Sequence, residues 1–205
     1  MLLCDVGNSY AHFFNGEKYW YESLNDFIEN HKKDSVYYIN VNEKVKDYLK
    51  NLKNWTDLEK YIKFDTKYSG MGIDRKVACL AIEDGVVVDA GSAITVDLMI
   101  DKKHIGGFIM PGFKSIEKAF KSISVKLDKK IDFDIDIEKI PLNTEDAISY
   151  GAIKPAVLAI KDFAKDKKIY LTGGDGEKLY KFLNNSVYDK NLIFKGMIKV
   201  IKEIS

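Results

Sequence analysis

Two loops of the sequence combine an aspartate, a glycine and a serine directly after an apolar run. They are Asp5-Val6-Gly7-Asn8-Ser9 near the start and Asp89-Ala90-Gly91-Ser92-Ala93 in the second half. Glycine lets backbone amides approach a phosphate, the serine hydroxyl donates a hydrogen bond, and a carboxylate can hold hydrated Mg²⁺. Either loop alone is also typical of an ordinary Asp-Gly turn. Their repetition with similar flanks favours two facing loops that hold a triphosphate and its cation.

A third candidate feature is Arg75, the only arginine among 32 basic Lys and Arg residues. A chain that uses lysine almost everywhere is expected to keep arginine where a planar, bidentate hydrogen-bond donor is required. Arg75 follows Gly72-Ile73-Asp74 at the expected start of a helix, where amides and guanidinium can bind an anion together. A helix with Asp74 in its first turn, or a stray surface arginine, would have the same sequence.

A fourth feature is the pair Gly173-Gly174, which follows a short apolar run. Backbone without side chains can approach a flat ligand such as an adenine or a ribose, although a simple strand-to-helix turn has the same pattern. Other motifs are absent from the sequence. It contains no Walker A loop, no complete dinucleotide fingerprint, no zinc-ligand spacing and no Gly-x-Ser-x-Gly elbow.

Strands are needed to position these loops, and the apolar patterning predicts two similar sets. The predicted strands cover residues 2–4, 11–14 and 17–21 in the first set and 86–88, 94–100 and 104–110 in the second. Asn15-Gly16 is a strong signal for a hairpin turn within the first set. We therefore predict an α/β fold with two related halves, residues 1–84 and 85–205, each a mixed sheet flanked by helices.

Helices and further strands are expected around these sets. Helical spacing covers residues 24–31, 43–52, 71–82, 114–127, 144–164, 177–183 and 197–204, and buried strands are expected at 36–40 and 169–171. Pro155 lies inside the longest predicted helix, so we expect a kink near Gly151.

The composition excludes several classes of function. The chain has 205 residues and a formal net charge of +1 at pH 7, which argues against nucleic acid as its main partner. No apolar run reaches the roughly 18 residues that span a bilayer, and the N-terminus has no basic leader. Two cysteines, Cys4 and Cys79, cannot form a disulfide framework and are expected in the core. We expect a soluble, cytoplasmic protein without a membrane or nucleic-acid partner.

Six motifs, taken in order, are similar to those of a known family. They are Asp5-Val6-Gly7-Asn8-Ser9, Gly72-Ile73-Asp74-Arg75, residues 89–97, residues 106–112, residues 143–148 and Leu171-Thr172-Gly173-Gly174. They resemble type III pantothenate kinases, members of the actin-like and sugar kinase superfamily with duplicated ribonuclease H-like halves. The first motif is shared across the superfamily, whereas Gly-x-Asp-Arg together with Gly-Gly-x-Ile-x-Pro-Gly is much narrower. Ser9 and Ser92 stand where threonine is usual, a change that keeps the hydroxyl.

The resemblance implies ATP-dependent phosphorylation of pantothenate to 4'-phosphopantothenate, the first step of coenzyme A biosynthesis. It implies Asp74 as the proton acceptor, Asp89 as the ligand of a monovalent cation, K⁺ or NH₄⁺, and Mg²⁺ bound with ATP. The implied pantothenate contacts are Tyr68, Gly72, Ile73, Asp74, Arg75 and Thr144. The implied ATP contacts are Asp5, Val6, Gly7, Asn8, Ser9, Tyr10, Ala11, His12 and Ser92. The family is homodimeric, so a homodimer is expected.

Two other functions are compatible with these motifs. One is a regulatory protein of the same fold that binds ATP or pantothenate without turnover. The other is a kinase of a different small alcohol, such as a sugar. Asp74 and Arg75 beside both acidic loops favour the enzyme, because a binding protein has no need of a positioned base. No long sugar-binding insertion is visible in the sequence.

Overall fold

The computed structural model describes residues 1–204 and consists of two units, each of which is described by itself. Unit 1 contains Met1–Glu83, Met99–Ile105 and the C-terminal segment from Asn191, and unit 2 contains Asp84–Leu98 and Gly106–Lys190. Along the chain, unit 2 first begins after Glu83, one residue before the predicted boundary between residues 84 and 85. Met99–Ile105 and the segment from Asn191 also belong to unit 1, whereas the sequence places them in the second half. They join unit 1 through tertiary contacts that apolar patterning does not reveal.

A five-stranded sheet in the order β3-β2-β1-β4-β5 forms the centre of unit 1. Its strands are β1 (Leu2–Val6), β2 (Tyr10–Phe14), β3 (Tyr19–Ser23), β4 (Val36–Asn40) and β5 (Trp55–Asp57). β1 pairs antiparallel with β2 and parallel with β4, so the sheet is mixed as predicted. The hairpin turn between β2 and β3 contains Gly16 at a φ of 103°, which glycine adopts readily. β5 was not predicted from the sequence.

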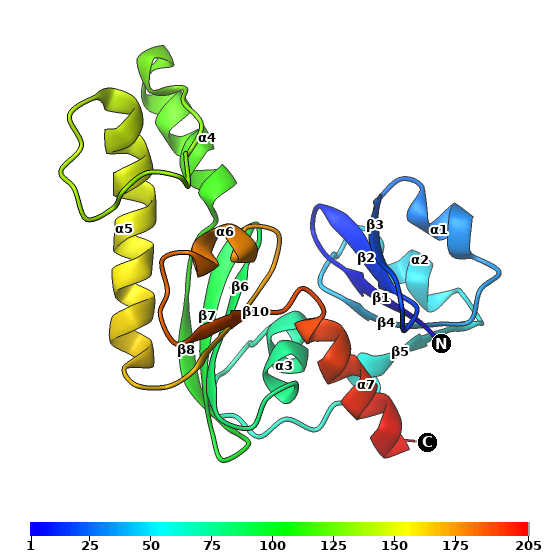
Figure 1. The fold of residues 1–205 in the computed structure, drawn as a ribbon. Coiled ribbons are helices and arrows are strands. Elements are labelled where there is room, and N and C mark those ends of the chain that lie inside the picture. The colour runs from blue at the N-terminus through cyan, green and yellow to red at the C-terminus, as the bar shows by residue number, and fades with distance from the viewer. Residues whose placement is uncertain (205) are drawn as a thin grey trace. The chain divides into compact units, whose positions relative to one another are not determined.

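Helices cover both faces of this sheet (Figure 1). They are α1 (Phe27–His31), α2 (Lys46–Lys50), the 3₁₀ helix η1 (Leu58–Tyr61), α3 (Ile73–Leu80) and α7 (Leu192–Ile204). Neighbouring residues of β1 point to opposite faces, so Cys4 packs with Phe27 of α1, whereas Leu3 packs with Val77 and Met197 of α3 and α7. α1 and α2 are shorter than predicted, and α7 begins earlier. Both cysteines are buried in the core, as expected, and neither forms a disulfide.

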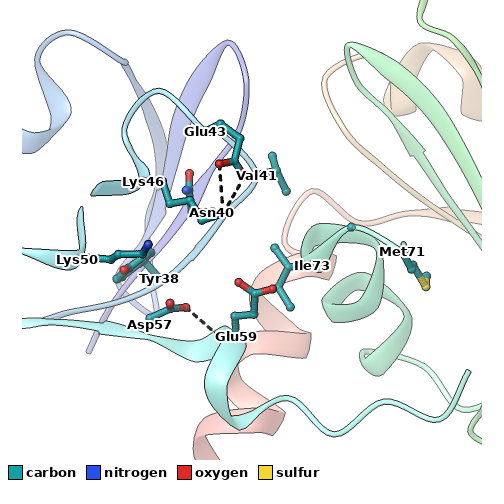
Figure 2. A pocket seen from close by; sticks show the side chains of 11 residues that line it. Tyr38, Asn40, Val41, Glu43, Lys46, Lys50, Asp57, Glu59, Met71 and Ile73 are labelled. Atoms are coloured by element: carbon teal, nitrogen blue, oxygen red, sulfur yellow. Dashed lines mark hydrogen bonds and ion pairs between the residues drawn. The ribbon is translucent and has the colours of Figure 1, made fainter. Parts of the chain in front are cut away.

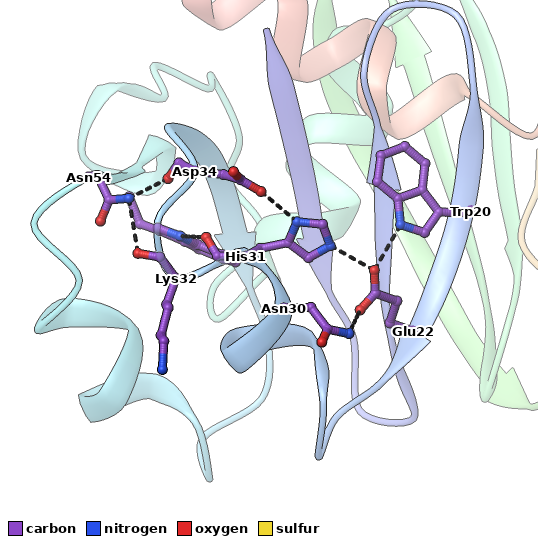
Figure 3. Close-up of polar contacts among 8 residues, drawn as sticks. Trp20, Glu22, Asn30, His31, Lys32, Asp34 and Asn54 are labelled. Atoms are coloured by element: carbon purple, nitrogen blue, oxygen red, sulfur yellow. Dashed lines mark hydrogen bonds and ion pairs between the residues drawn. The ribbon is translucent and has the colours of Figure 1, made fainter.

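A polar cluster ties α1 to β3 at the edge of unit 1 (Figure 3). His31 Nε2 lies 2.7 Å from Glu22 Oε1, and His31 Nδ1 lies 2.8 Å from Asp34 Oδ2. Glu22 also accepts hydrogen bonds from Trp20 Nε1 at 2.9 Å and from Asn30 Nδ2 at 2.7 Å. One imidazole therefore connects two carboxylates across the end of the helix.

Unit 2 repeats the strand order of unit 1. Its sheet has the order β8-β7-β6-β9-β10 when it is followed from the β8 edge. This is the order of unit 1, β3-β2-β1-β4-β5, with five added to each strand number. The strands are β6 (Gly85–Ala90), β7 (Ala93–Ile100), β8 (Lys103–Pro111), β9 (Ile169–Thr172) and β10 (Ser186–Tyr188). β6 and β10 both pair parallel with β9, as β1 and β5 do with β4. The duplication predicted from the two acidic loops is therefore present in the topology.

Helices of unit 2 pack on this second sheet through one core. They are α4 (Phe113–Ile123), the 3₁₀ helix η2 (Val125–Leu127), α5 (Thr144–Ala164) and α6 (Gly176–Tyr180). α5 has the predicted bounds and continues through Pro155 as one helix (Figure 1). The kink near Gly151 stays a prediction. Among residues 1–204, no helix is long and apolar enough to cross a membrane.

Candidate functional site

The first acidic loop lies between β1 and β2 of unit 1. Asp5 is the next-to-last residue of β1, pairs with Ile39 of β4 and His12 of β2, and is 8% exposed. The amide of Gly7 donates to Tyr10 O at 3.0 Å, which closes a tight turn. Asn8 and Ser9 at its tip are exposed. The turn thus presents backbone and a hydroxyl to solvent beside a buried carboxylate.

The other predicted ATP contacts, Val6, Tyr10, Ala11 and His12, differ in their exposure to solvent. Val6 and Ala11 are buried in the core below the turn, whereas Tyr10 is exposed. His12 Nδ1 lies 2.7 Å from Tyr19 Oη, and burial lowers the pKa of His12. His12 is therefore a neutral partner of Tyr19 at neutral pH.

Asn42 is a loop residue that the sequence analysis did not single out. It follows β4, is 4% exposed, and its Nδ2 donates to Gly7 O at 3.3 Å. Val41 N also donates to Val6 O at 3.0 Å. Asn42 therefore braces the first acidic loop from the neighbouring parallel strand. The signal in the sequence was an asparagine just after a buried strand, where parallel strands place functional side chains.

The Gly72–Arg75 motif forms the start of α3. Gly72 is the N-cap residue, and Asp74 Oδ1 accepts a hydrogen bond from Arg75 N at 2.8 Å. Asp74 is half-buried in the first turn of the helix. A Cβ added at Gly72 would lie 2.6 Å from Asp74 Oδ1, so glycine leaves room for this carboxylate. The capping role and a chemical role for Asp74 are compatible, because a carboxylate has two oxygens.

Arg75 is not a stray surface arginine. It is 6% exposed, and its guanidinium carbon lies 4.7 Å from the ring centroid of Tyr68. The structure therefore brings together two of the predicted pantothenate contacts, Tyr68 and Arg75, within unit 1. A cation–π contact of this kind restricts the guanidinium, which suits bidentate recognition of a carboxylate.

A cavity of about 310 Å³ in unit 1 adjoins this motif (Figure 2). Its lining comprises Tyr38, Asn40, Val41, Glu43, Lys46, Lys50, Asp57, Glu59, Met71, Gly72 and Ile73. Burial, together with the charges of Asp57 and Glu59, raises the pKa of Tyr38 to about 12. Lys46 Nζ is engaged by Glu43 at 2.9 Å. The cavity thus carries both signs of charge and shares Gly72 and Ile73 with the substrate motif.

The second acidic loop and the Gly-Gly loop lie side by side in unit 2. Asp89 of β6 pairs with Thr172 of β9, and Asp175 N donates to Ala90 O at 2.9 Å. Gly173 has a φ of 85° and directly follows β9. Two features that were separate in the sequence therefore form one structure at the ends of parallel strands.

Ser92 lies at the tip of this loop, with an exposed side chain. Its carbonyl oxygen accepts from Gly112 N and from Ser115 Oγ, both at 3.2 Å. A Cβ at Gly112 would overlap the carbonyl oxygens of Gly91 and Ser92, so only glycine fits there. The start of α4 thus holds the second loop in place.

Thr144 is the remaining predicted pantothenate contact, and it belongs to unit 2. It is the exposed first residue of α5 and lines a cavity of about 530 Å³ with residues of η2 and the following turn. No residue of 89–93 lines that cavity. Among residues 1–204, no group of three or more His, Cys, Asp or Glu side chains is arranged to hold a metal ion.

Comparison with solved structures identifies the fold. EutJ from Carboxydothermus hydrogenoformans is 12% identical, with a TM-score of 0.52 over 95% of this chain and 87% of that one. MreB 5 from Spiroplasma citri is 10% identical, with a TM-score of 0.51 over 99% and 96%. These similarities confirm the predicted actin-like, duplicated ribonuclease H-like fold.

Comparison with sequences extends over the whole chain. The family described as "Type III pantothenate kinase" matches residues 34–166. Type III pantothenate kinases from Campylobacter jejuni and Wolinella succinogenes are 49% and 45% identical, over 99% and 100% of this chain and 97% and 98% of the relatives. A Campylobacter jejuni crystal structure, described as a candidate Baf family transcriptional activator, is 48% identical, with a TM-score of 0.92 over 100% of this chain and 98% of that one. The chain belongs to the type III pantothenate kinase family.

Proposed function

We propose that this protein transfers a phosphoryl group from ATP to the primary alcohol of pantothenate, which commits pantothenate to coenzyme A biosynthesis. The observation that carries this proposal is the similarity to type III pantothenate kinases over at least 99% of the chain. The pairing of Asp74 with a buried Arg75 at the start of α3 supports it, because the reaction needs a base beside an anion-binding group.

The proposed ATP contacts come from both acidic loops. The turn at Gly7 to Ser9 offers amides and a hydroxyl for phosphate oxygens, and Asn42 keeps that turn in place. Ser92 offers a second exposed hydroxyl from a loop anchored to α4. Phosphoryl transfer depends mostly on positioning and charge neutralisation, which such preorganised donors provide.

Asp74 is the proposed proton acceptor, and Arg75 the proposed partner of the pantothenate carboxylate. Asp74 takes the proton from the substrate hydroxyl as the hydroxyl oxygen bonds to the terminal phosphorus of ATP, and the bond between that phosphorus and the bridging oxygen breaks so that ADP leaves. A positioned general base of this kind contributes roughly 10² to 10⁴ in rate. Tyr68, Gly72, Ile73 and Thr144 are the other proposed pantothenate contacts.

Two cations complete the proposal: Mg²⁺ with ATP, and K⁺ or NH₄⁺ at Asp89. A carboxylate is present for each cation, since Asp5 is buried beside the first turn and Asp89 is half-buried near the end of β6. Bound cations would neutralise phosphate charge during the transfer. Asp5 and Asp89 would orient them through carboxylate oxygens, the ligands that hard cations prefer.

The proposed quaternary structure is a homodimer, and unit 2 presents a surface suited to it. Val125 and Leu142 are 88% and 94% exposed, and Ile123 and Ile140 are also largely exposed. These apolar side chains come from the same part of unit 2 as Thr144, and a second copy would remove them from water.

We place the enzyme in the cytoplasm, where ATP is supplied. We assign the first phosphate loop to a half that covers residues 1–84, and the second phosphate loop to a half that covers residues 85–205.

A coupled assay of ADP release tests the proposed function. Purified protein is given ATP and Mg²⁺ with pantothenate, and in parallel with a panel of sugars and polyols. We expect ADP release that depends on pantothenate and on no other alcohol of the panel. Binding of pantothenate without ADP release would instead support a regulatory protein, and turnover of a sugar would support a different kinase.

A further inference from the structure

His104, Thr66 and Tyr68 form a partly buried chain of polar contacts in unit 1, and Thr66 and His104 have no role in the site described above. His104, near the start of β8, is 5% exposed, and its Nδ1 lies 2.7 Å from Thr66 Oγ1. The same Thr66 Oγ1 accepts a hydrogen bond from Tyr68 N at 3.0 Å. One hydroxyl therefore connects an imidazole that is distant in sequence to the backbone of Tyr68.

Backbone contacts fix the relative position of the two segments. Thr66 and His104 form an isolated parallel β-bridge, and His104 N donates to Asp65 O at 3.3 Å. Because this bridge fixes the two main chains relative to each other, it also places the Thr66 and His104 side chains within hydrogen-bonding distance. The segment before α3 thus has a defined place against the start of β8.

Ring contacts continue the chain from His104 to Arg75. The His104 ring meets the Tyr68 ring edge-on, with centroids 6.0 Å apart. The centroid of the Phe64 ring lies 5.6 Å from that of the His104 ring. Tyr68 in turn lies 4.7 Å from the guanidinium carbon of Arg75. His104 therefore contacts Tyr68 directly through its ring and indirectly through Thr66, and Tyr68 contacts the buried arginine.

The plane of a guanidinium decides whether its two forward N–H groups can meet both oxygens of a carboxylate. The cation–π contact with the Tyr68 ring restricts the movement of the Arg75 guanidinium. A shift of the Tyr68 backbone would move the ring and release the restriction. His104 is buried, and Thr66 and Tyr68 are half-buried, so loss of the Thr66 hydroxyl removes two partly buried hydrogen bonds and disturbs the neighbouring backbone.

We propose that Thr66 and His104 are positioning residues, which fix Tyr68 and through it the guanidinium of Arg75 for the carboxylate of pantothenate. This inference rests on the proposed function. Neither residue touches the substrate. Their effect is on the affinity for pantothenate and not on the transfer step or on ATP.

Thr66→Val tests the proposal, because valine keeps the branched shape and removes the hydroxyl. Loss of two neutral hydrogen bonds is expected to raise KM for pantothenate about tenfold. We expect kcat to change by less than about twofold, the difference that one weak hydrogen bond makes, and KM for ATP to stay the same. Thr66→Ser, which keeps the hydroxyl, should restore KM for pantothenate. Thr56→Val is the matched control, since Thr56 is a half-buried threonine of β5 in the same unit.

A double-variant cycle separates positioning from a general loss of structure. In the Tyr68→Leu background the ring is gone, so Thr66→Val should add no further increase in KM for pantothenate. If Thr66→Val does not fold, His104→Gln breaks the same chain and is read in the same way.

Two results would overturn the inference while leaving the proposed function intact. The first is an active wild type together with a Thr66→Val variant whose KM for pantothenate is unchanged. The second is an equal increase in KM with and without Tyr68. A wild type that turns over no pantothenate is a different result, because it overturns the proposed function and the positioning role with it.

Discussion

Gly173 lies against Asp89 so closely that a Cβ added at Gly173 would overlap the Oδ1 atom of Asp89. The same Cβ would lie 2.7 Å from both the carbonyl carbon and the oxygen of Ala90. With a φ of 85°, Gly173 also has a conformation that side chains disfavour. The second acidic loop and the Gly-Gly loop are therefore one closely packed structure, and a change in one displaces the other.

Gly173→Ala is expected to destabilise the protein and to weaken the use of ATP. Backbone strain of this kind costs about 1 to 3 kcal/mol, and relief of the overlap would push the Asp89 carboxylate aside. Thermal unfolding and kcat/KM for ATP measure the two effects. Gly174→Ala is the control, because a Cβ at Gly174 has no neighbour within 4 Å. Equal effects of the two variants would contradict this account.

The proposed cation site at Asp89 predicts activation by K⁺ or NH₄⁺ over Na⁺. The rate is measured in matched chloride buffers at fixed Mg²⁺. Asp89→Asn should lose most of the difference between K⁺ and Na⁺, because the amide lacks the charge that holds a cation. Identical rates of the wild type in Na⁺ and K⁺ would leave Asp89 as a turn residue.

Asp74→Asn is expected to fold and to bind ATP but to lose turnover. The change is nearly isosteric, and the asparagine oxygen can still accept the hydrogen bond from Arg75 N, so α3 should keep its cap. Only the proton acceptor is removed. Circular dichroism, ATP binding and kcat are compared with the wild type. If kcat stays above about a tenth of the wild-type value, another base is at work, given the rate range of general-base catalysis. Asp5 and Asp89 would then be tested.

Arg75→Lys tests whether the guanidinium fork itself is required. Lysine keeps the charge but loses the planar guanidinium and at least one charge-assisted hydrogen bond, a loss of roughly 1.5 to 3 kcal/mol. We expect kcat/KM for pantothenate to fall about ten- to hundredfold, whereas the value for ATP should not change. A fall of less than about twofold, below the value of one such bond, would show that an ammonium is adequate at this position.

The His31 cluster predicts a pH dependence of stability. Burial by itself lowers the pKa of His31, but the hydrogen bonds and charges of Glu22 and Asp34 outweigh it and raise the pKa above the ordinary 6.5. Protonated His31 therefore stabilises the folded state fully below pH 6.5, and this contribution is lost as the pH rises through the raised pKa. Asp34 is 49% exposed, so solvent screens its share.

Urea unfolding of the wild type and of His31→Gln, at a series of pH values from about 6 upward, measures this contribution. The wild type should be the more stable at the acidic end, and the difference in the free energy of unfolding should shrink as the pH rises. A difference that is constant with pH would mean that the ring packs but its charge does not contribute.

Local features of the sequence were sufficient for several elements. The strand at 36–40 and the helix at 144–164 have the predicted bounds, because apolar patterning and a cap define them locally. At the start of the helix Asn143 Oδ1 accepts from Asp146 N at 2.9 Å. The repeated aspartate and glycine loops also indicated the duplicated topology. These features depend on residues close in sequence, so patterning was enough.

Other features depend on contacts between distant parts of the chain. β5 and β10 have three residues each, too few for a periodic signal, and they form because a neighbouring parallel strand pairs with them. α7 belongs to unit 1 because Gly196 allows it to approach the backbone of Val77 on α3.

The candidate site shows the same division between sequence and tertiary structure. The repetition of the acidic loop and the ordered resemblance of six motifs to one family predicted the chemistry, although each motif alone is also typical of an ordinary turn or helix start. Only the tertiary structure buried Arg75 over Tyr68 and joined Thr66 to His104. These pairs are decided by packing between strands and loops far apart in sequence, and no local pattern records that packing.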